Sequence, residues 1–252
     1  VDGTLADTEM AHLAAFNHAF SEFGLDWHWD VAQYTQLLEV SGGKERIRAY
    51  WESRGDMPLE VAHNSIEQTI ARLHELKTAA YEQAVQDGAV HMRPGVLALM
   101  SAAAHEGMRL AIATTTSPVN ISNLLRRWMG PDWASHFQVI EDASTAPQKK
   151  PHPRVYLQTL QRLGLAASQC LAIEDSANGL RAASAAGLAT VITTNAFTEH
   201  HDFKGALRVL PDLHSVSLAQ LQDWHAQSLA SHCIAGGTPR LAVCPAGPGI
   251  GQ

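Results

Sequence analysis

The sequence predicts an α/β protein in which a Rossmann-like parallel sheet carries an inserted all-helical region. From residue 108 onward, short apolar runs alternate with helix-like segments. Residues 11–86 have helical apolar spacing and no β-branched run between them. The Asp2-Gly3 turn comes before this helical stretch, so the sheet is expected to begin before the insert and continue after it. Alternating strands and helices of these lengths are typical of a parallel sheet covered on both faces.

The elements of the sheet are expected in a regular order. Each apolar run is read as a buried strand and each following amphipathic segment as a helix, with the Arg93-Pro94-Gly95 turn marking the return from the insert. The expected strands are 108–113, 137–140, 170–173 and 189–193, and the expected helices are 95–106, 118–129, 152–163 and 176–186. The expected domains are a core of residues 1–10 and 87–230, a helical cap of residues 11–86, and a disordered tail of residues 231–252.

Composition excludes several classes of protein. The 252 residues are 46% hydrophobic with a net charge of −7, which suits a globular protein and offers no general attraction for nucleic acid or an anionic membrane surface. No apolar run approaches the roughly 20 residues that span a bilayer. The three cysteines form no CxxC pair, which argues against a disulfide framework or a zinc knuckle. We expect a cytoplasmic monomer, or a plastid protein if the source is a photosynthetic eukaryote.

Polar residues follow the predicted strands, where parallel sheets bind their ligands. Thr114, Thr115 and Thr116 come directly after the strand at 108–113, and their hydroxyls could hold a phosphoryl group. The same hydroxyls could simply cap the next helix, which is a common role of Ser and Thr. Lys150 lies in a proline-bounded turn and could neutralise a phosphate or be a solvated surface charge.

Two adjacent carboxylates, Glu174 and Asp175, directly follow the predicted strand at 170–173. Unpaired charges at the end of an apolar strand are costly, whereas a Mg²⁺ ion would satisfy both carboxylates with oxygen ligands. The alternative is a helix N-cap at Asp175 or Ser176, with Glu174 as a surface charge.

The order and spacing of these motifs resemble the four motifs of the haloacid-dehalogenase-like phosphatases, from residue 1 to about residue 195. The first motif is the string from Val1 to Leu5, which alone could be an ordinary Asp-Gly turn. The strings that begin at Asp7, Ser41, Ala113 and Glu174 are further similar to the CbbY subgroup, relatives of β-phosphoglucomutase. The substrate known for that subgroup is xylulose 1,5-bisphosphate.

The resemblance implies a phosphatase that uses Mg²⁺ and an aspartyl-phosphate intermediate. In the family's Asp-x-Asp motif the first Asp attacks phosphorus and the second is general acid and then general base; Asp2 matches the second. Thr114 would bind the transferring phosphoryl oxygens, and Lys150 would neutralise negative charge. Glu174 and Asp175 would hold Mg²⁺ together with the nucleophile and the backbone carbonyl of Asp2.

The nucleophile would be the residue before Val1, which the sequence does not contain. Because the strand that ends in the nucleophile is central in this fold, its loss would leave neighbouring strand edges unpaired. We therefore expect the chain as given to be inactive and unstable, even where its parent is a phosphatase.

The helical insert is expected to act as a cap that closes over the site and selects the substrate. In the string Ser41-Gly42-Gly43-Lys44-Glu45-Arg46, the glycines allow a close backbone approach, and Lys44 and Arg46 could grip the second phosphate of a bisphosphate. A helix start with solvated charges is the alternative.

Other substrate contacts are expected from the start of the insert and from the core. Glu9 and His12 are three residues apart, so on a helix they share one face. His12 alone could equally be a structural histidine, whereas Glu9 could accept a sugar hydroxyl. The remaining expected contacts are Thr115, Thr116, Asn120 and Arg126.

Two other functions are compatible with these motifs. A phosphosugar mutase of the β-phosphoglucomutase kind would share the nucleophile and the metal but would keep water away from the aspartyl phosphate. A non-catalytic relative would bind a phosphosugar and would lack the nucleophilic Asp. The product, free phosphate or a rearranged phosphosugar, distinguishes the two enzymes.

Overall fold

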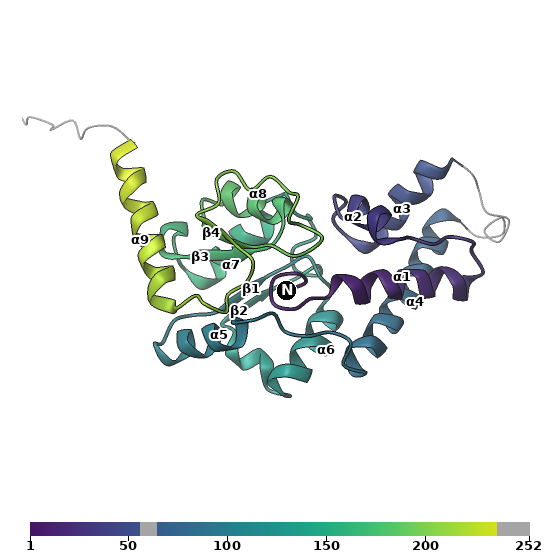
Figure 1. Ribbon diagram of the computed structural model, residues 1–252, viewed down its shortest axis with the longest axis horizontal. Coiled ribbons are helices and arrows are strands. Elements are labelled where there is room, and N and C mark those ends of the chain that lie inside the picture. Colours follow the sequence, from purple (N-terminus) through teal and green to yellow (C-terminus); the bar gives the residue numbers. More distant parts are fainter. Residues whose placement is uncertain (56–64, 236–252) are drawn as a thin grey trace, which may run out of the picture.

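Two regions lie side by side in the protein, a group of helices α1 to α4 and a parallel sheet with helices α5 to α9 around it (Figure 1). The structure is a computed structural model that describes residues 1–55 and 65–235. We call α1 to α4 and their connections the helical region, and the remainder the core. The division of the chain into domains remains a prediction, but the helices of the helical region run from Glu9 to Gln86, close to the expected range 11–86.

The sheet consists of parallel strands, as the sequence predicts. β1 (Ala111–Ala113) pairs with β2 (Val139–Glu141). β3 (Leu171–Glu174) pairs with β4 (Ala189–Thr193), which pairs with β5 (Arg208–Leu210). In the described residues the strands thus form two hydrogen-bonded groups, and one continuous sheet is not present.

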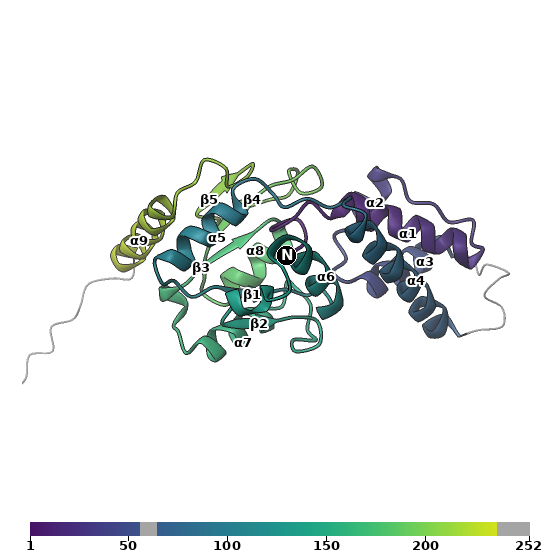
Figure 2. The same ribbon diagram turned by 90° about the horizontal axis from the view of Figure 1, so that it is seen from below.

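The start of the chain packs between these two groups of strands. Leu5 contacts the hydrophobic cluster of Ile112 beside β1 and also the cluster of Val191 in β4. Asp2 forms an isolated bridge with Ala6, so the first residues turn tightly instead of forming a strand. Figure 2 shows the N-terminus beside β1 and α6, in agreement with the packing of Val1 on the hydrophobic clusters that contain Ile112 and Leu124. The turn brings Asp2 to the same end of the sheet as the residues that follow β1 and β3.

The core helices α5 to α8 agree with the four predicted helices, with small shifts at their ends, whereas α9 was not predicted. Ser117 accepts a hydrogen bond from the backbone N–H of Asn120, and Pro118 occupies the first helical position, so the helix begins at the residue that the sequence predicts. The helices are α5 (Val96–His105), α6 (Pro118–Met129), α7 (Arg154–Leu163), α8 (Ala177–Ala185) and α9 (Leu218–Ala235), with 3-10 turns at Trp133–His136 and Ala167–Gln169.

The helical region has an aromatic core of its own. Phe20 lies 4.8 Å from Trp29, and Trp27 lies 5.4 Å from Trp51, as measured between ring centroids. Phe197 from the core packs on the ring of Tyr34 at 5.9 Å, which joins the two regions. The helices are α1 (Glu9–Phe23), α2 (Val31–Leu37), α3 (Gly43–Arg54) and α4 (Ile66–Gln86).

Two expectations need correction or fall outside the structure. The tail predicted from residue 231 is wrong at its start, because α9 continues to Ala235; residues 236–252 lie outside the described part of the chain. Residues 56–64 of the expected cap are likewise not described, and α4 begins after them at Ile66, where Ser65 and Gln68 form a capping box. None of the described helices has the length and apolar character needed to cross a lipid bilayer.

Candidate active site

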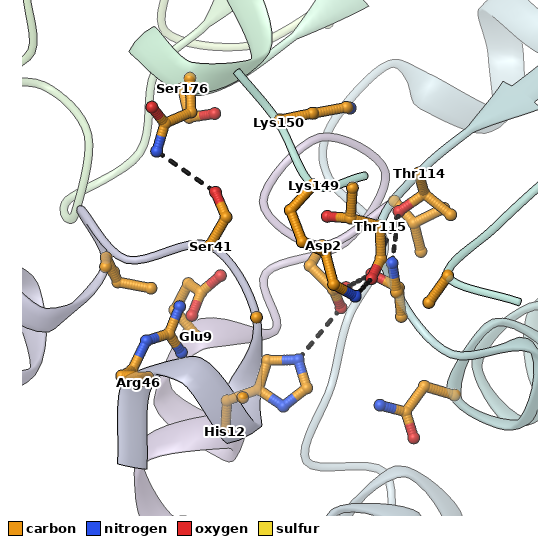
Figure 3. A pocket seen from close by; sticks show the side chains of 18 of the residues that line it. Asp2, Glu9, His12, Ser41, Arg46, Thr114, Thr115, Lys149, Lys150 and Ser176 are labelled. Atoms are coloured by element: carbon orange, nitrogen blue, oxygen red, sulfur yellow. Dashed lines mark hydrogen bonds and ion pairs between the residues drawn. The ribbon is translucent and has the colours of Figure 1, made fainter. Parts of the chain in front are cut away.

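A cavity of about 410 Å³ lies between the carboxyl ends of β1 and β3 and the helical region (Figure 3). Every residue predicted for the site lines this cavity except Arg126. The core supplies Asp2, Thr114, Thr115, Thr116, Asn120, Lys150, Glu174 and Asp175, and the helical region supplies Glu9, His12, Ser41, Gly42, Gly43, Lys44 and Arg46.

Arg126, predicted as a substrate contact, does not line the cavity, so the structure does not bring it together with the other predicted site residues. It follows Asn120 by six residues on α6, which turns its side chain by about 120° and moves it about 9 Å along the helix axis. Asn120 is buried and lines the cavity, whereas Arg126 is exposed.

Asp2 is held by hydrogen bonds to both of its carboxylate oxygens. His12 Nε2 lies 3.1 Å from Oδ1, and the Thr116 hydroxyl donates to Oδ2. Burial alone would raise the pKa of Asp2, but the hydrogen bonds from His12 and then from Thr116 help to bring it well below its ordinary value. Asp2 is therefore a carboxylate in the protein without a ligand.

Lys77 fixes the ring of His12 from the other side. Its Nζ lies 2.8 Å from His12 Nδ1, and the ammonium can only donate, so Nδ1 accepts and Nε2 carries the hydrogen that points to Asp2. Lys77 is only 5% exposed and lies over the rings of Phe16 and Tyr81. Burial lowers the pKa of Lys77 to about 8.

Replacing Lys77 by Met is expected to raise stability and lower activity. The pKa of Lys77 is about 8 in the folded state and about 10.5 in the unfolded state, so between these pH values the folded protein binds fewer protons. The free energy of unfolding therefore falls as the pH drops through this range. Below pH 8, Lys77 is charged in both states, and the full cost of its buried charge opposes folding. Met removes this penalty, and the melting temperature at pH 7 should rise. Without the ammonium, His12 can take the other tautomer and turn a lone pair towards Asp2, so kcat should fall by about 10–100-fold. A lower melting temperature together with an unchanged kcat would contradict both parts.

The carboxylate of Glu174 accepts hydrogen bonds from two side chains. Lys150 Nζ lies 2.5 Å from its Oε1, and the Tyr156 hydroxyl donates to the same oxygen. Lys150 also donates to the carbonyl of Ala113 at 3.0 Å, which holds it at the end of β1. Burial opposes ionisation of Glu174, but Lys150 lowers the pKa of this carboxyl.

Asp175 has weaker partners and a higher pKa. The Thr4 hydroxyl donates to its Oδ1 at 2.9 Å, and the Asn195 amide donates to Oδ2 at 3.2 Å. Burial, together with the neighbouring charge of Glu174, raises the pKa of Asp175 to about 7. Gly3, at φ 67°, leaves room for this carboxylate, since a Cβ there would stand 2.1 Å from Oδ2. A positive charge at this position would therefore stabilise the ionised form.

The residues at this strand end fit a hard divalent cation. Asp2, Glu174 and Asp175 line one cavity, Glu174 and Asp175 are 4% and 8% exposed, and all three offer oxygen ligands. The raised pKa of Asp175 indicates that the protein groups alone do not balance the negative charge there. Oxygen donors in this number suit Mg²⁺ or a similar ion better than a soft metal.

Arg46, in the first turn of α3, hydrogen-bonds to the loop before this helix, whereas the sequence predicted a contact with the substrate. Its guanidinium donates to the carbonyls of Leu37 and Val40, at 3.0 and 3.3 Å, and to the Tyr34 hydroxyl at 3.2 Å. Arg46 is buried and so holds the loop from within, although it also borders the cavity. Lys44 is exposed and lines the cavity, so it is the cation of this string that is free to meet a ligand.

Several residues of the site were not predicted from the sequence. Lys77 and His74 lie on α4 and line the cavity, and Tyr156 on α7 contacts Glu174. In the sequence, Lys77 is one polar residue among many on a long amphipathic helix, and only the packing of α4 on α1 brings it to His12. Its four-residue spacing from Tyr81, which stacks on His12 at 4.0 Å, is a pattern that could have drawn attention to it.

Comparison with known proteins identifies relatives along most of the chain. A family model described as haloacid dehalogenase-like hydrolase matches residues 1–193. Protein CbbY, plasmid, of Cupriavidus necator is 54% identical over 213 residues, which are 84% of this chain and 83% of that protein. Protein CbbY of Rhodobacter capsulatus is 43% identical over 213 residues, 84% of this chain and 91% of that protein.

Solved structures agree with these relatives. The crystal structure of CbbY from Rhodobacter sphaeroides in complex with phosphate has a TM-score of 0.81 and 38% identity, and covers 88% of this chain and 96% of that chain. A mutant of that protein in complex with xylulose-(1,5)bisphosphate matches with the same TM-score of 0.81. The family model spans most of the chain, and the CbbY proteins of Cupriavidus necator and Rhodobacter capsulatus exceed 40% identity over 84% of it. The chain therefore belongs to the haloacid dehalogenase-like hydrolases and, within them, is similar to the CbbY proteins.

Proposed function

We propose that this protein is a Mg²⁺-dependent phosphatase that hydrolyses a sugar bisphosphate, xylulose 1,5-bisphosphate, through an aspartyl-phosphate intermediate. The observation that carries the proposal is the meeting of Asp2, Thr114, Lys150, Glu174 and Asp175 in one cavity from separate strand ends. The likeness to a CbbY mutant in complex with xylulose-(1,5)bisphosphate supports the choice of substrate. The mechanism requires an aspartate at the position directly before Val1.

In the first step, a carboxylate oxygen of that aspartate attacks phosphorus, and the bond from phosphorus to the sugar oxygen breaks. Asp2 gives its proton to the departing sugar oxygen. In the second step, water attacks the aspartyl phosphate, Asp2 takes a proton from that water, and inorganic phosphate leaves. His12 and Thr116 hold Asp2 in one orientation through both steps.

Mg²⁺ bound by Glu174, Asp175, the backbone carbonyl of Asp2 and the nucleophilic carboxylate would reduce the repulsion between two anions. Thr114 is buried at the end of β1, with its hydroxyl 3.1 Å from that of Thr116, where it can donate to a phosphoryl oxygen. Lys150, already paired with Glu174, adds a positive charge beside the reacting group.

The second phosphate of the substrate is proposed to lie near Lys44, at the wall of the cavity that the helical region supplies. Lys44 lines the cavity together with Lys77, Lys149 and His74. Burial and the positive charges of Lys77, Lys44 and Lys149 lower the pKa of His74 to about 4. An anionic group at this wall would be attracted by these lysines. We also propose that the helical region is the cap that closes on the substrate, because Lys44 and Lys77 both come from it.

The test is phosphate release by the protein in a form that carries an aspartate, with the strand leading to it, before Val1. Mg²⁺-dependent release from xylulose 1,5-bisphosphate, abolished by EDTA, is the expected result. Lys44→Met should raise the KM for the bisphosphate about tenfold or more, since a hydrogen bond to a charged group is lost. Arg48→Met, one turn further along α3 and outside the cavity, is the matched control.

Other outcomes would change the proposal in defined ways. Release from phosphoglycolate or glucose 1-phosphate alone would keep the catalytic residues and reject the bisphosphate. A rearranged phosphosugar in place of free phosphate would indicate a mutase. Binding of the bisphosphate without turnover, in the presence of the aspartate, would indicate a non-catalytic binding protein.

A further inference from the structure

A second cavity, of about 460 Å³, lies where the helical region meets the core, and His201 lines both this cavity and the catalytic one. Glu39, from the loop between α2 and α3, faces His200 and His201, which follow β4. In Figure 1 the segment after β4 approaches α2 at this place. The cavity therefore has one wall from each region.

Three potential metal ligands converge there. Glu39, His200 and His201 can each present one ligand atom, and these atoms lie within 4.8 Å of one another. His201 Nε2 stands 3.5 Å from Glu39 Oε1, which is too long for a good hydrogen bond. In a tetrahedral zinc site with bonds of 2.0–2.1 Å, two ligand atoms are about 3.4 Å apart. The spacing of this pair thus suits a bridging ion better than a direct contact.

The state of His201 gives an independent reason to expect a ligand. Its side chain is only 8% exposed, and Nε2 is a buried polar atom without a hydrogen-bond partner. A buried nitrogen of this kind normally has a partner, because leaving it without one costs about 1–3 kcal/mol. His200, whose ring lies 4.6 Å from that of His201, and the half-exposed Glu39 leave access from solvent.

We propose that Glu39, His200 and His201 form a binding site for a zinc-class transition metal ion that joins the helical region to the core. Two imidazoles and one carboxylate are a usual ligand set for Zn²⁺, with water in the fourth position. The site is separate from the proposed Mg²⁺ site, whose ligands are all oxygens.

Neighbouring groups limit the affinity of this site. His201 Nδ1 accepts a long hydrogen bond of 3.3 Å from the backbone N–H of Ala177, and binding metal at Nε2 moves the ring proton to Nδ1 and gives up that bond. Arg181 and Lys204 also border the cavity and repel a cation, whereas Asp202 attracts it. The three ligands must outweigh these costs, so each of them is needed for binding.

A bound ion would restrain the loop that leads to the substrate-facing glycines. Asn178, on α8, already donates to the carbonyl of Glu39 at 3.2 Å and to the Ser41 hydroxyl at 3.3 Å. The metal would add a stronger link at the same residue of the loop. The helical region would thereby be held on the core, whatever reaction the neighbouring cavity supports.

The test is Zn²⁺ binding to the full chain by titration calorimetry, with Mg²⁺ in large excess to occupy oxygen sites. The wild type should bind one more Zn²⁺ than His200→Ala and Glu39→Gln, or bind it at least about tenfold more tightly. Zn²⁺ should raise the melting temperature of the wild type and not of these variants. His18→Ala is the matched control, since His18 and Glu22 form an exposed pair at 3.1 Å elsewhere on the surface.

Both variants change exposed side chains, so loss of the fold is not expected, and circular dichroism will check this. Equal stoichiometry and affinity in the wild type, His200→Ala and Glu39→Gln would overturn the proposal. So would a loss of binding in His18→Ala of the same size, which would indicate nonspecific surface binding.

Discussion

Replacing Asp2 by Asn is expected to lower kcat for phosphate release by about 10²–10⁴-fold, the usual contribution of a general acid and base. Asn has nearly the same shape and remains within reach of His12 and Thr116, so the fold should persist. It cannot carry the proton between the sugar oxygen, water and the carboxylate. The measurement is steady-state phosphate release from the bisphosphate, in the form of the protein with an aspartate before Val1.

The charge on Asp2 makes this prediction sharper. His12 and Thr116 stabilise its ionised form, which is the form that takes a proton from water in the base step. The acid step needs a protonated Asp2, and a dianionic phosphate nearby raises the pKa of a carboxyl. Both steps thus depend on the same two oxygens, and neither can proceed through an amide.

Asp142→Asn is the matched control for this variant. Asp142 also follows a strand and is buried, but its Oδ1 accepts from the backbone and hydroxyl of Ser144, and it does not line the cavity. Its kcat should stay within about twofold of the wild type below the melting temperature. A comparable kcat for Asp2→Asn would show that another group transfers the proton.

The ends of the buried strands were the most predictable part of the protein. An apolar run followed by Thr114, or by Glu174 and Asp175, gives both the strand and the direction of its polar end, because parallel strands share one carboxyl edge. β5 was missed because Arg208–Leu210 is a partly exposed segment of three residues without a distinct apolar pattern.

Residues that act through the packing of distant segments were harder to predict. Lys77 contacts His12 although the two residues are 65 positions apart in the sequence, and no local pattern in either helix predicts this contact. Arg126 was expected to contact the substrate together with Asn120, but its position on α6 leaves it exposed to solvent. Arg46 was expected to bind substrate because its positive charge can be read from the sequence. The sequence does not reveal that the carbonyls of Leu37 and Val40 accept its hydrogen bonds.

Arg93→Ala is expected to cause the largest loss of stability, about 3–5 kcal/mol in the free energy of unfolding. Arg93 is 6% exposed, and its guanidinium donates to the carbonyls of Gly3, Thr193, Thr194 and Pro211. Removing it leaves four acceptors without this donor, and a buried unsatisfied carbonyl costs about 1–3 kcal/mol. Urea unfolding of the wild type and the variant measures the difference.

Arg93 also lies where the chain returns from the helical region, and its Nε is 3.4 Å from Oδ1 of Asp7, where the chain departs. Arg93→Lys keeps the charge but not the fork of donors, so it should recover only part of the loss. The control Arg72→Ala removes an exposed arginine paired with Glu75 and should change stability by less than about 0.5 kcal/mol. A loss below about 1 kcal/mol for Arg93→Ala would mean that water or other donors replace the guanidinium. Because the Gly3 carbonyl is next to Asp2, and Thr194 precedes the Asn195 that holds Asp175, the same variant should lose activity even at temperatures where it remains folded.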